Sequence, residues 1–506
     1  MSDTGTPVDN ETGRPEVSGV PERYRMGPLV GLVGLALVPL AALAALLVWS
    51  DAEADEYEIS SNELPETVEP ATEPAPALAT TVFDYRRAPA SLSQQSSDYE
   101  LARSIEQLAA FVDDRSCLAV SVDGRPVSSW NGDLPVIPAS ANKLLIAGAA
   151  TEILGADHRF TTSVASPAPV DGVVEGDLYL VGGGDPLLVA ADFPTDDEAG
   201  DLAPTTLLDV LADDVVAAGI TSIRGSIVGD GTRYDNEFAN PTWGNDVAYV
   251  DAGPIGGLLV NDGQTVGRSG RQREPSDAAA REFSRLLRDR GVSISNGWDS
   301  GEVEPGTPVI ATVESQPLSA IVADMLTFSD NDTAEMLLKE IGVVAADEGT
   351  TGAGLRVLDL TVRSWGAPME GVVLTDASGL STDNRLTCDT LIGVLDHLEP
   401  GPTVDGLPVA GRSGTLIDEF LGTPVEGALR AKTGTLSNPP DDADPPEVKA
   451  LAGYLEAPNG DVLEFALVLN GPGYVTADGY ISFWSALAER LADHPTGPSI
   501  RALGPR

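Results

Sequence analysis

The sequence predicts an α/β fold of the α+β type, preceded by one transmembrane helix and interrupted by a large β-rich insert. Strand-like segments stand near both ends of the folded region with helical segments between them, which suggests one sheet assembled from both chain ends. Gly- and Asp-rich turns separate short β-like segments from 166 to 314. Leu29 to Trp49 contains no charged residue and, at about 1.5 Å per residue, is long enough as a helix to cross a bilayer.

The N-terminal segments predict that the folded region lies outside the membrane. Residues 1–26 are polar and rich in Gly, Pro and Glu, which is typical of a disordered tail. Arg23 and Arg25 precede the apolar helix at 27–49 and acidic residues follow it, so the positive-inside bias puts the N-terminus in the cytoplasm. We expect a single-pass protein of the cell membrane. A cleaved signal peptide is the alternative, disfavoured by the long apolar run and the lack of an A-x-A site.

Composition and local pattern divide the rest of the chain. The acidic, Pro-rich segment after the apolar helix predicts an extended stalk, and the fold is expected to begin near Tyr99. The predicted stalk covers residues 50–92. The main domain is split into 93–165 and 315–495, with the insert at 166–314 between its parts and a tail at 496–506 after it. The chain of 506 residues is too long for a single core, which agrees with such a division.

Hydrophobic spacing predicts the elements of the main domain. Leu101, Ile105 and Leu108 recur at helical spacing, and Asp123-Gly124 forms a turn between two short strands. Ser140 is expected to open an apolar helix. Later helices of the main domain are expected at 318–327, 334–345, 355–364, 386–397 and 481–492, and two helices are expected within the insert, at 207–218 and 277–290. The closing strands are expected at 427–432, 451–455 and 465–469.

Charge and cysteine content exclude several classes of protein. The chain has 78 acidic and 30 basic residues, a formal net charge of −48, and nucleic acid as a partner would need a basic surface instead. Three scattered histidines, with no HExxH or CxxC motif, argue against a metal site, and no cofactor is expected. Cys117 and Cys388 form either one disulfide across the main domain or two buried thiols.

Only four of the 30 basic residues are lysines, and two of them stand in motifs that need a lysine. Arginine stays protonated in proteins, whereas a lysine amine can lose its proton when its site lowers its pKa. Ser140-x-x-Lys143 has no second match in the chain. Lys432-Thr433-Gly434 also occurs once. Residues i and i+3 of a helix share a face, so Lys143 can lie beside Ser140 and activate its hydroxyl as a nucleophile.

A third motif, Ser329-Asp330-Asn331, lies between these two. The S-x-N pattern is weak, since it also occurs elsewhere, for example at Ser60 and Ser129. Its position at the end of an apolar helix favours Ser329, and we expect Asp330 to be solvated rather than catalytic.

A decoy for the lysine motif precedes it in the chain. Arg412–Thr415 reads Arg-Ser-Gly-Thr, but it lacks the lysine and leads into a helical-looking segment. Lys432 instead ends a strand-like run, as a substrate clamp at a sheet edge requires.

The three motifs in this order resemble the D-alanyl-D-alanine carboxypeptidase/endopeptidase family, the class C low-molecular-mass penicillin-binding proteins, over roughly residues 95–490. The interval of 189 residues from Ser140 to Ser329 fits the extra domains that this family carries there and exceeds that of small class A β-lactamases. Three further segments are similar to family segments, at Gly176–Pro186, at Asp376–Arg385 and at Gly414–Leu416 leading into Arg430–Leu436.

The resemblance implies a penicillin-binding/β-lactamase-type transpeptidase domain, an antiparallel sheet with helices on both faces. It implies a serine-type D-Ala-D-Ala carboxypeptidase, a hydrolase that acts on peptidoglycan stem peptides and is inhibited by β-lactam antibiotics. Most members are secreted or loosely attached, so an uncleaved anchor would be a departure. The alternatives are a β-lactamase on the same scaffold and a catalytically inactive cell-wall-binding protein. The retained lysines argue against the latter.

Residue roles also follow from the resemblance. Ser140 would attack the peptide carbonyl with Lys143 as the base. Ser329 would relay the proton to the departing D-alanine, Asn331 would hold Lys143 and the substrate amide, and Lys432 would supply fixed positive charge. The substrate-binding residues would be Thr433, Gly434 and Thr435, with the two threonines on the terminal carboxylate. The backbone N–H groups of Ser140 and Thr435 would form an oxyanion hole.

Overall fold

The computed structural model describes residues 88–194, 204–244, 247–265, 270–399, 401–437 and 444–503. The predicted cytoplasmic tail, the predicted transmembrane helix and the predicted stalk up to residue 87 lie outside the described residues. Within the described part of the chain, no helix combines the length and the apolar character needed to cross a membrane.

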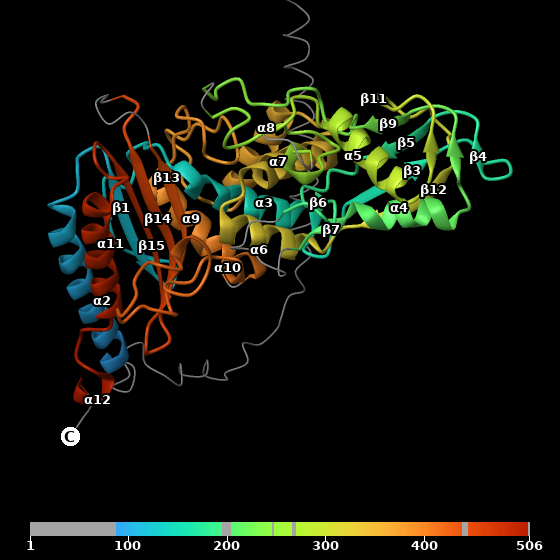
Figure 1. Ribbon diagram of the computed structural model, residues 1–506. Coiled ribbons are helices and arrows are strands. Elements are labelled where there is room, and N and C mark those ends of the chain that lie inside the picture. The colour runs from blue at the N-terminus through green and yellow to red at the C-terminus, as the bar shows by residue number, and fades with distance from the viewer. Residues whose placement is uncertain are drawn as a thin grey trace, which may run out of the picture. The chain divides into compact units, whose positions relative to one another are not determined.

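Five antiparallel strands form the main sheet, in the order β13-β14-β15-β1-β2 (Figure 1). Their bounds are β1 Cys117–Val122, β2 Arg125–Trp130, β13 Arg430–Leu436, β14 Val448–Glu456 and β15 Val462–Asn470. Strands from both ends of the main domain therefore meet in one sheet, as the sequence predicts. The central strands β14 and β15 are almost wholly buried, which fits strands that are covered on both faces.

Helices cover both faces of the main sheet, and alternate residues of its strands point into two separate cores. One core contains α3 (Lys143–Leu154) and α9 (Cys388–Leu398). The other contains α2 (Ala88–Ala109) and α11 (Ala477–Ala492). The first core is extended by α6 Leu318–Phe328, α7 Asn331–Ala346, α8 Thr351–Ser364 and α10 Pro402–Asp405. The predicted antiparallel sheet with helices on both faces is confirmed.

The helix α2 begins earlier than the sequence predicts. It starts at Ala88, inside the predicted stalk, rather than near Tyr99. The helix α12 (Ile500–Leu503), within the predicted tail, packs against α2. The Gly497 N–H donates to the Ser97 hydroxyl at 3.0 Å, and Ser97 is buried. Contacts with the far end of the chain thus support a helix whose first turns show no apolar spacing in the sequence.

The insert has a sheet of its own, with strands in the order β11-β9-β5-β3-β12. The helices α4 (Leu208–Ala217) and α5 (Pro275–Asp289) pack against this sheet. The strand β3 (Thr161–Ala165) pairs with β12 (Val309–Glu314), although the sequence assigns β3 to the main domain. The remaining strands of this sheet are β5 Leu178–Val181, β9 Ile227–Asp230 and β11 Trp298–Ser300. The strands of the insert outside this sheet are β4 Val173–Val174, β6 Leu188–Val189, β7 Thr206–Leu207, β8 Ser222–Ile223 and β10 Ser293–Ile294.

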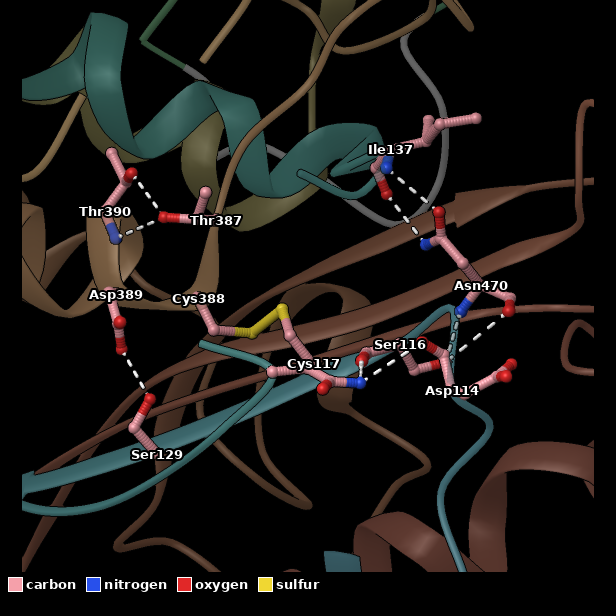
Figure 2. Close-up of a disulfide and its surroundings, with 11 residues drawn as sticks. Asp114, Ser116, Cys117, Ser129, Ile137, Thr387, Cys388, Asp389, Thr390 and Asn470 are labelled. Carbon is pink, nitrogen blue, oxygen red and sulfur yellow. Dashed lines mark hydrogen bonds between the residues drawn. A yellow bond between two sulfur atoms is a disulfide. The ribbon is translucent and has the colours of Figure 1, made fainter. Parts of the chain in front are cut away.

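A disulfide joins the main sheet to a covering helix, as Figure 2 shows. Cys117 in β1 is bonded to Cys388 at the start of α9, with the two Cα atoms 5.8 Å apart. The Ser129 hydroxyl of β2 donates to the Asp389 carboxylate at 2.8 Å, so consecutive residues of α9 contact the sheet. Of the two alternatives that the sequence leaves open, the structure contains the single disulfide.

Removing this cross-link by the double substitution Cys117→Ala and Cys388→Ala is expected to lower the free energy of unfolding by about 2–5 kcal/mol, because the bridge restricts the unfolded chain. Guanidinium denaturation of the oxidised wild type and the variant measures the difference. A thiol reductant should destabilise the wild type and leave the variant unchanged. Equal denaturation midpoints for the oxidised wild type and the variant would show that the bridge adds no stability.

Candidate active site

Ser140 lies in a short 3₁₀ turn, η1 (Ala139–Asn142), and α3 begins only at Lys143. The expectation that Ser140 opens the α-helix is therefore wrong by one turn. In a 3₁₀ turn residues i and i+3 lie directly above one another, which brings the two side chains together. The Lys143 Nζ is 3.1 Å from the Ser140 Oγ. The predicted pairing holds, although the local structure that produces it is different.

Lys143 is fully buried and has three polar neighbours. Its Nζ donates to the Asn331 Oδ1 at 2.6 Å and to the Ser378 carbonyl at 2.7 Å, and it also contacts Ser140. Desolvation lowers the pKa of Lys143 to about 8, although the negative charges of Asp330 and other nearby acids act in the opposite direction. The amine can therefore lose its proton near neutral pH, as a base must.

The Ser329-Asp330-Asn331 motif forms the junction between α6 and α7. Ser329 ends α6 in the left-handed conformation, with φ of 62°. Asp330 is the N-cap of α7, and its carboxylate accepts the Thr333 N–H at 2.6 Å. Asp330 thus has a structural role, which the expectation of a merely solvated side chain missed. Asn331 begins α7 and reaches Lys143.

The lysine motif lies inside β13, not at the end of a strand, because β13 continues to Leu436. Gly434 lets this strand approach η1, the turn that contains Ser140 and is called the nucleophile turn below. A Cβ at Gly434 would lie 3.0 Å from the Pro138 carbonyl oxygen and 3.1 Å from the Ala139 Cβ. Lys432 is fully buried, and its Nζ donates to the Thr433 carbonyl at 2.8 Å.

Burial in turn affects the charge of Lys432. Desolvation, and then the charge of Lys143, hold the pKa of Lys432 well below its usual value. Burial therefore opposes the fixed positive charge that the sequence predicts for this residue. An anion beside Lys432 would reverse the effect, because an opposite charge favours the protonated amine.

The motif residues meet at a cavity of about 750 Å³. Ser140, Ser329, Asn331, Thr433 and Thr435 line it, and Lys143 reaches it through Ser140. Gly434 stands between the two threonines and contacts the nucleophile turn instead. Other lining residues come from the insert and from the decoy segment, and include Thr242, Val247, Asp251 and Thr415.

The sequence did not reveal Glu335, which positions one partner of Lys143. Its buried carboxylate accepts the N–H groups of Ala377 and Ser378 at 3.0 and 2.7 Å, so it holds the Ser378 carbonyl toward the amine. Burial, and then the charge of Asp376, raise the pKa of Glu335 to about 7. Its spacing of four residues from Asn331 on α7 is the available signal, since both lie on one helix face.

Asp376 fixes the rest of this loop. Its carboxylate accepts from the N–H groups of Gly379 and Ser381 at 2.8 and 2.6 Å. It also accepts from the Asn384 amide at 2.7 Å and from the Trp243 indole at 2.9 Å. The segment Asp376–Arg385, identified from the sequence only by resemblance, therefore holds in place the Ser378 carbonyl that accepts from Lys143.

The decoy segment is also part of the site. The Thr433 hydroxyl donates to the Thr415 hydroxyl at 2.7 Å, and Thr415 lines the cavity. The segment Gly414–Leu416 is a 3₁₀ turn, η4, which packs beside β13. The sequence excludes this segment as the lysine motif because it lacks a lysine, although Gly414–Leu416 belongs to one of the segments that resemble the family; in the structure its threonine contacts the lysine motif.

A serine, an amine of lowered pKa and two hydroxyl-bearing strand residues around one cavity define an acyl-transferring serine enzyme, on an α+β fold of the penicillin-binding and β-lactamase type. The chain belongs to the D-Ala-D-Ala carboxypeptidase 3 (S13) family, whose sequence profile matches residues 101–272 and 259–482.

Individual relatives agree with this membership. The chain is 30% identical to the D-alanyl-D-alanine carboxypeptidase of Actinomadura sp. (strain R39), over 73% of this chain and 79% of the relative. It is 33% identical to carboxypeptidase DacB of Mycolicibacterium smegmatis, over 90% and 95% of the two chains. The crystal structure of penicillin-binding protein 4 (dacB) from Haemophilus influenzae has the same fold, with a TM-score of 0.64 and 19% identity over 76% of this chain and 99% of that one.

The two motif lysines are expected to respond differently to arginine. Lys143→Arg should abolish acylation of Ser140 because arginine cannot accept the proton, whereas Lys432→Arg should retain measurable acylation because it supplies the charge. Because the pKa of Lys143 is lowered to about 8, the wild-type acylation rate should rise as pH increases through about 8 and then level off. Time courses of labelling by a fluorescent penicillin measure both effects.

Equal loss of labelling in the two variants would show that the proposed division of roles is wrong. An acylation rate that does not change between about pH 6 and pH 9 would contradict the neutral amine as the base.

Proposed function

We propose that the protein is a serine-type D-Ala-D-Ala carboxypeptidase and endopeptidase that acts on peptidoglycan stem peptides through an acyl-enzyme on Ser140. The observation that carries this proposal is the environment of Lys143, a buried amine whose neighbours leave a single place for its lone pair. Membership of the carboxypeptidase family and the fold support the same activity. No cofactor takes part in the proposed reaction.

The hydrogen bonds of Lys143 direct its lone pair. A neutral amine has two N–H donors and one lone pair. The Asn331 Oδ1 and the Ser378 carbonyl can only accept, so they occupy both donors. The lone pair is left for the Ser140 hydroxyl. The orientation of Asn331 has a second support, because its amide nitrogen donates to the Asp251 carbonyl at 2.9 Å.

In the acylation step, the Ser140 Oγ attacks the carbonyl carbon of the penultimate D-alanine, and the hydroxyl proton passes to the Lys143 Nζ. The C–N bond to the terminal D-alanine then breaks, and Ser329 relays the proton to the leaving amine. The backbone N–H groups of Ser140 and Thr435 stabilise the oxyanion, and one such donor typically lowers the barrier by about 3–4 kcal/mol. Water then attacks the ester and releases the shortened peptide.

The terminal carboxylate of the substrate binds beside β13. Thr433 and Thr435 line the cavity, so their hydroxyl groups can reach the carboxylate. The Thr435 hydroxyl can donate to it, and the Thr433 hydroxyl can do so once its hydrogen bond to Thr415 is exchanged for one to the substrate. The bound carboxylate also favours the protonated form of Lys432, whose charge burial otherwise opposes. The substrate carboxylate and the Lys432 ammonium group therefore stabilise one another. A peptide with a free C-terminal carboxylate is preferred over an analogue with a neutral C-terminus.

Labelling with a fluorescent penicillin tests the nucleophile. A β-lactam carbonyl would acylate the same serine, so Ser140→Ala should remove the label, whereas Ser364→Ala, an exposed serine of α8, should leave it unchanged. Strong labelling of Ser140→Ala would show that another residue is the nucleophile. If the wild type consumes penicillin rapidly without retaining the label, the protein is a β-lactamase.

The same preparation distinguishes the two peptidase activities. Cross-linked and uncross-linked muropeptides are incubated with the wild type and with Ser140→Ala, and the products are identified by mass. Loss of one D-alanine from uncross-linked chains marks carboxypeptidase activity, and separation of cross-linked pairs marks endopeptidase activity.

We also propose that residues 27–49 anchor the protein in the cell membrane, with the N-terminus cytoplasmic and the catalytic domain outside. The charge-free apolar run and the arginines before it support this topology. Deleting residues 1–50 should move the penicillin-labelled protein from the membrane to the soluble fraction, and deleting 2–20, which keeps Arg23 and Arg25, should leave it in the membrane. Recovery of a full-length soluble wild type, or of a chain cleaved after the apolar run, would contradict the anchor.

A further inference from the structure

The two lysines outside the motifs have different surroundings. Lys339, on α7, is buried and forms an ion pair with Asp235 at 2.6 Å, so its charge has a partner. Lys449 lies on β14 directly opposite Thr435 in the register of the sheet. Directly opposed residues of an antiparallel pair project on the same face, so the lysine side chain can reach the threonine hydroxyl.

The ammonium group of Lys449 is held at one place. Its Nζ is 3.1 Å from the Thr435 Oγ1. It also lies over two rings of α11, 4.2 Å from the centroid of Tyr480 and 5.1 Å from that of Trp484. Ring faces attract cations, and the hydroxyl of Tyr480 is itself fixed by a hydrogen bond to Glu419 at 2.5 Å. The cation therefore has a defined position beside the cavity residue Thr435.

The chemistry of this contact orients the threonine. An ammonium group has donors and no acceptor, so the Thr435 oxygen must accept from Lys449. Its own O–H then points elsewhere and is available as a donor, and Thr435 lines the cavity. A hydroxyl that accepts from a cation is a stronger donor to an anion, because hydrogen bonds in a chain polarise one another.

We propose that Lys449 is a positioning residue that orients the Thr435 hydroxyl toward the terminal carboxylate of the substrate and adds positive charge to that subsite. The inference rests on the proposed function and deepens it: specificity for a free C-terminal carboxylate depends on Lys449 as well as on the lysine motif. Burial lowers the pKa of both lysines, but the charge of Glu419 opposes this effect at Lys449, whereas the charge of Lys143 adds to it at Lys432. A cation at this subsite also counts for more in a chain whose net charge is −48.

The test compares Lys449→Met, which keeps the length of the side chain, with Lys449→Arg, which keeps the charge. Arg363→Gln is the control for loss of one positive charge, since Arg363 is exposed on α8. Hydrolysis of a diacetyl-L-Lys-D-Ala-D-Ala peptide gives KM and kcat. The inhibition constant of an aryl boronic acid without a carboxylate, which bonds to Ser140, reports on the nucleophile alone.

Lys449→Met is expected to raise KM for the peptide roughly tenfold, as expected for loss of a hydrogen bond to a charged group, with a much smaller change in kcat. The boronic acid should inhibit it as well as it inhibits the wild type. Lys449→Arg should recover most of the affinity, and Arg363→Gln should resemble the wild type. In a Thr435→Val background, Lys449→Met should cause little further loss.

Three results would overturn the inference. An unchanged KM in Lys449→Met would show that the cation does not serve the carboxylate. Parallel losses of peptide and boronic acid binding would indicate a structural role, and a full additional loss in the Thr435→Val background would show that Lys449 does not act through that threonine. If the wild type binds neither the peptide nor the boronic acid, the proposed function itself fails.

Discussion

The site depends on one buried amine. The amine of Lys143 is fully desolvated where it lies beside Ser140, and hydrogen bonds to well-placed acceptors offset the free-energy cost of this burial. Those acceptors come from distant segments: Asn331 at the start of α7 and Ser378 in a loop held by Glu335. Both segments must adopt their folded positions before the hydrogen-bond donors of the amine are paired and its lone pair is directed at Ser140. Stability and catalysis therefore draw on the same hydrogen bonds.

The surrounding architecture brings these segments to the edge of the main sheet. Gly434 lets β13 approach the nucleophile turn, and the disulfide joins β1 to α9 on the same face. The insert contributes directly as well. The Asp332 carboxylate accepts from Arg271 at 2.6 Å, which fixes an insert loop to the residue next to Asn331. One wall of the cavity is thus supplied by residues far from the motifs in sequence.

The sequence could predict the features that depend on residue type and local spacing. The serine–lysine pair, the single lysine motif and the strands at both chain ends belong to this group. It could not predict features decided by distant contacts. Ser140 lies in a 3₁₀ turn, α2 extends back to Ala88, and β13 continues beyond Lys432, because packing partners elsewhere in the chain set these limits. Glu335 looks like any acidic helix residue until its burial is known.

The pairing of β3 with β12 explains how so long an insert is compatible with one active site. Thr161, the first residue of β3, is paired with Glu314, the last residue of β12, so the chain leaves and re-enters the main domain at neighbouring points. The entropic cost of bringing the two ends of a loop together rises only slowly with the number of residues in the loop. Once the insert has folded, its two ends lie side by side as in a hairpin, so α3, which follows the turn of Ser140, and α6 are placed as if they were close neighbours along the chain.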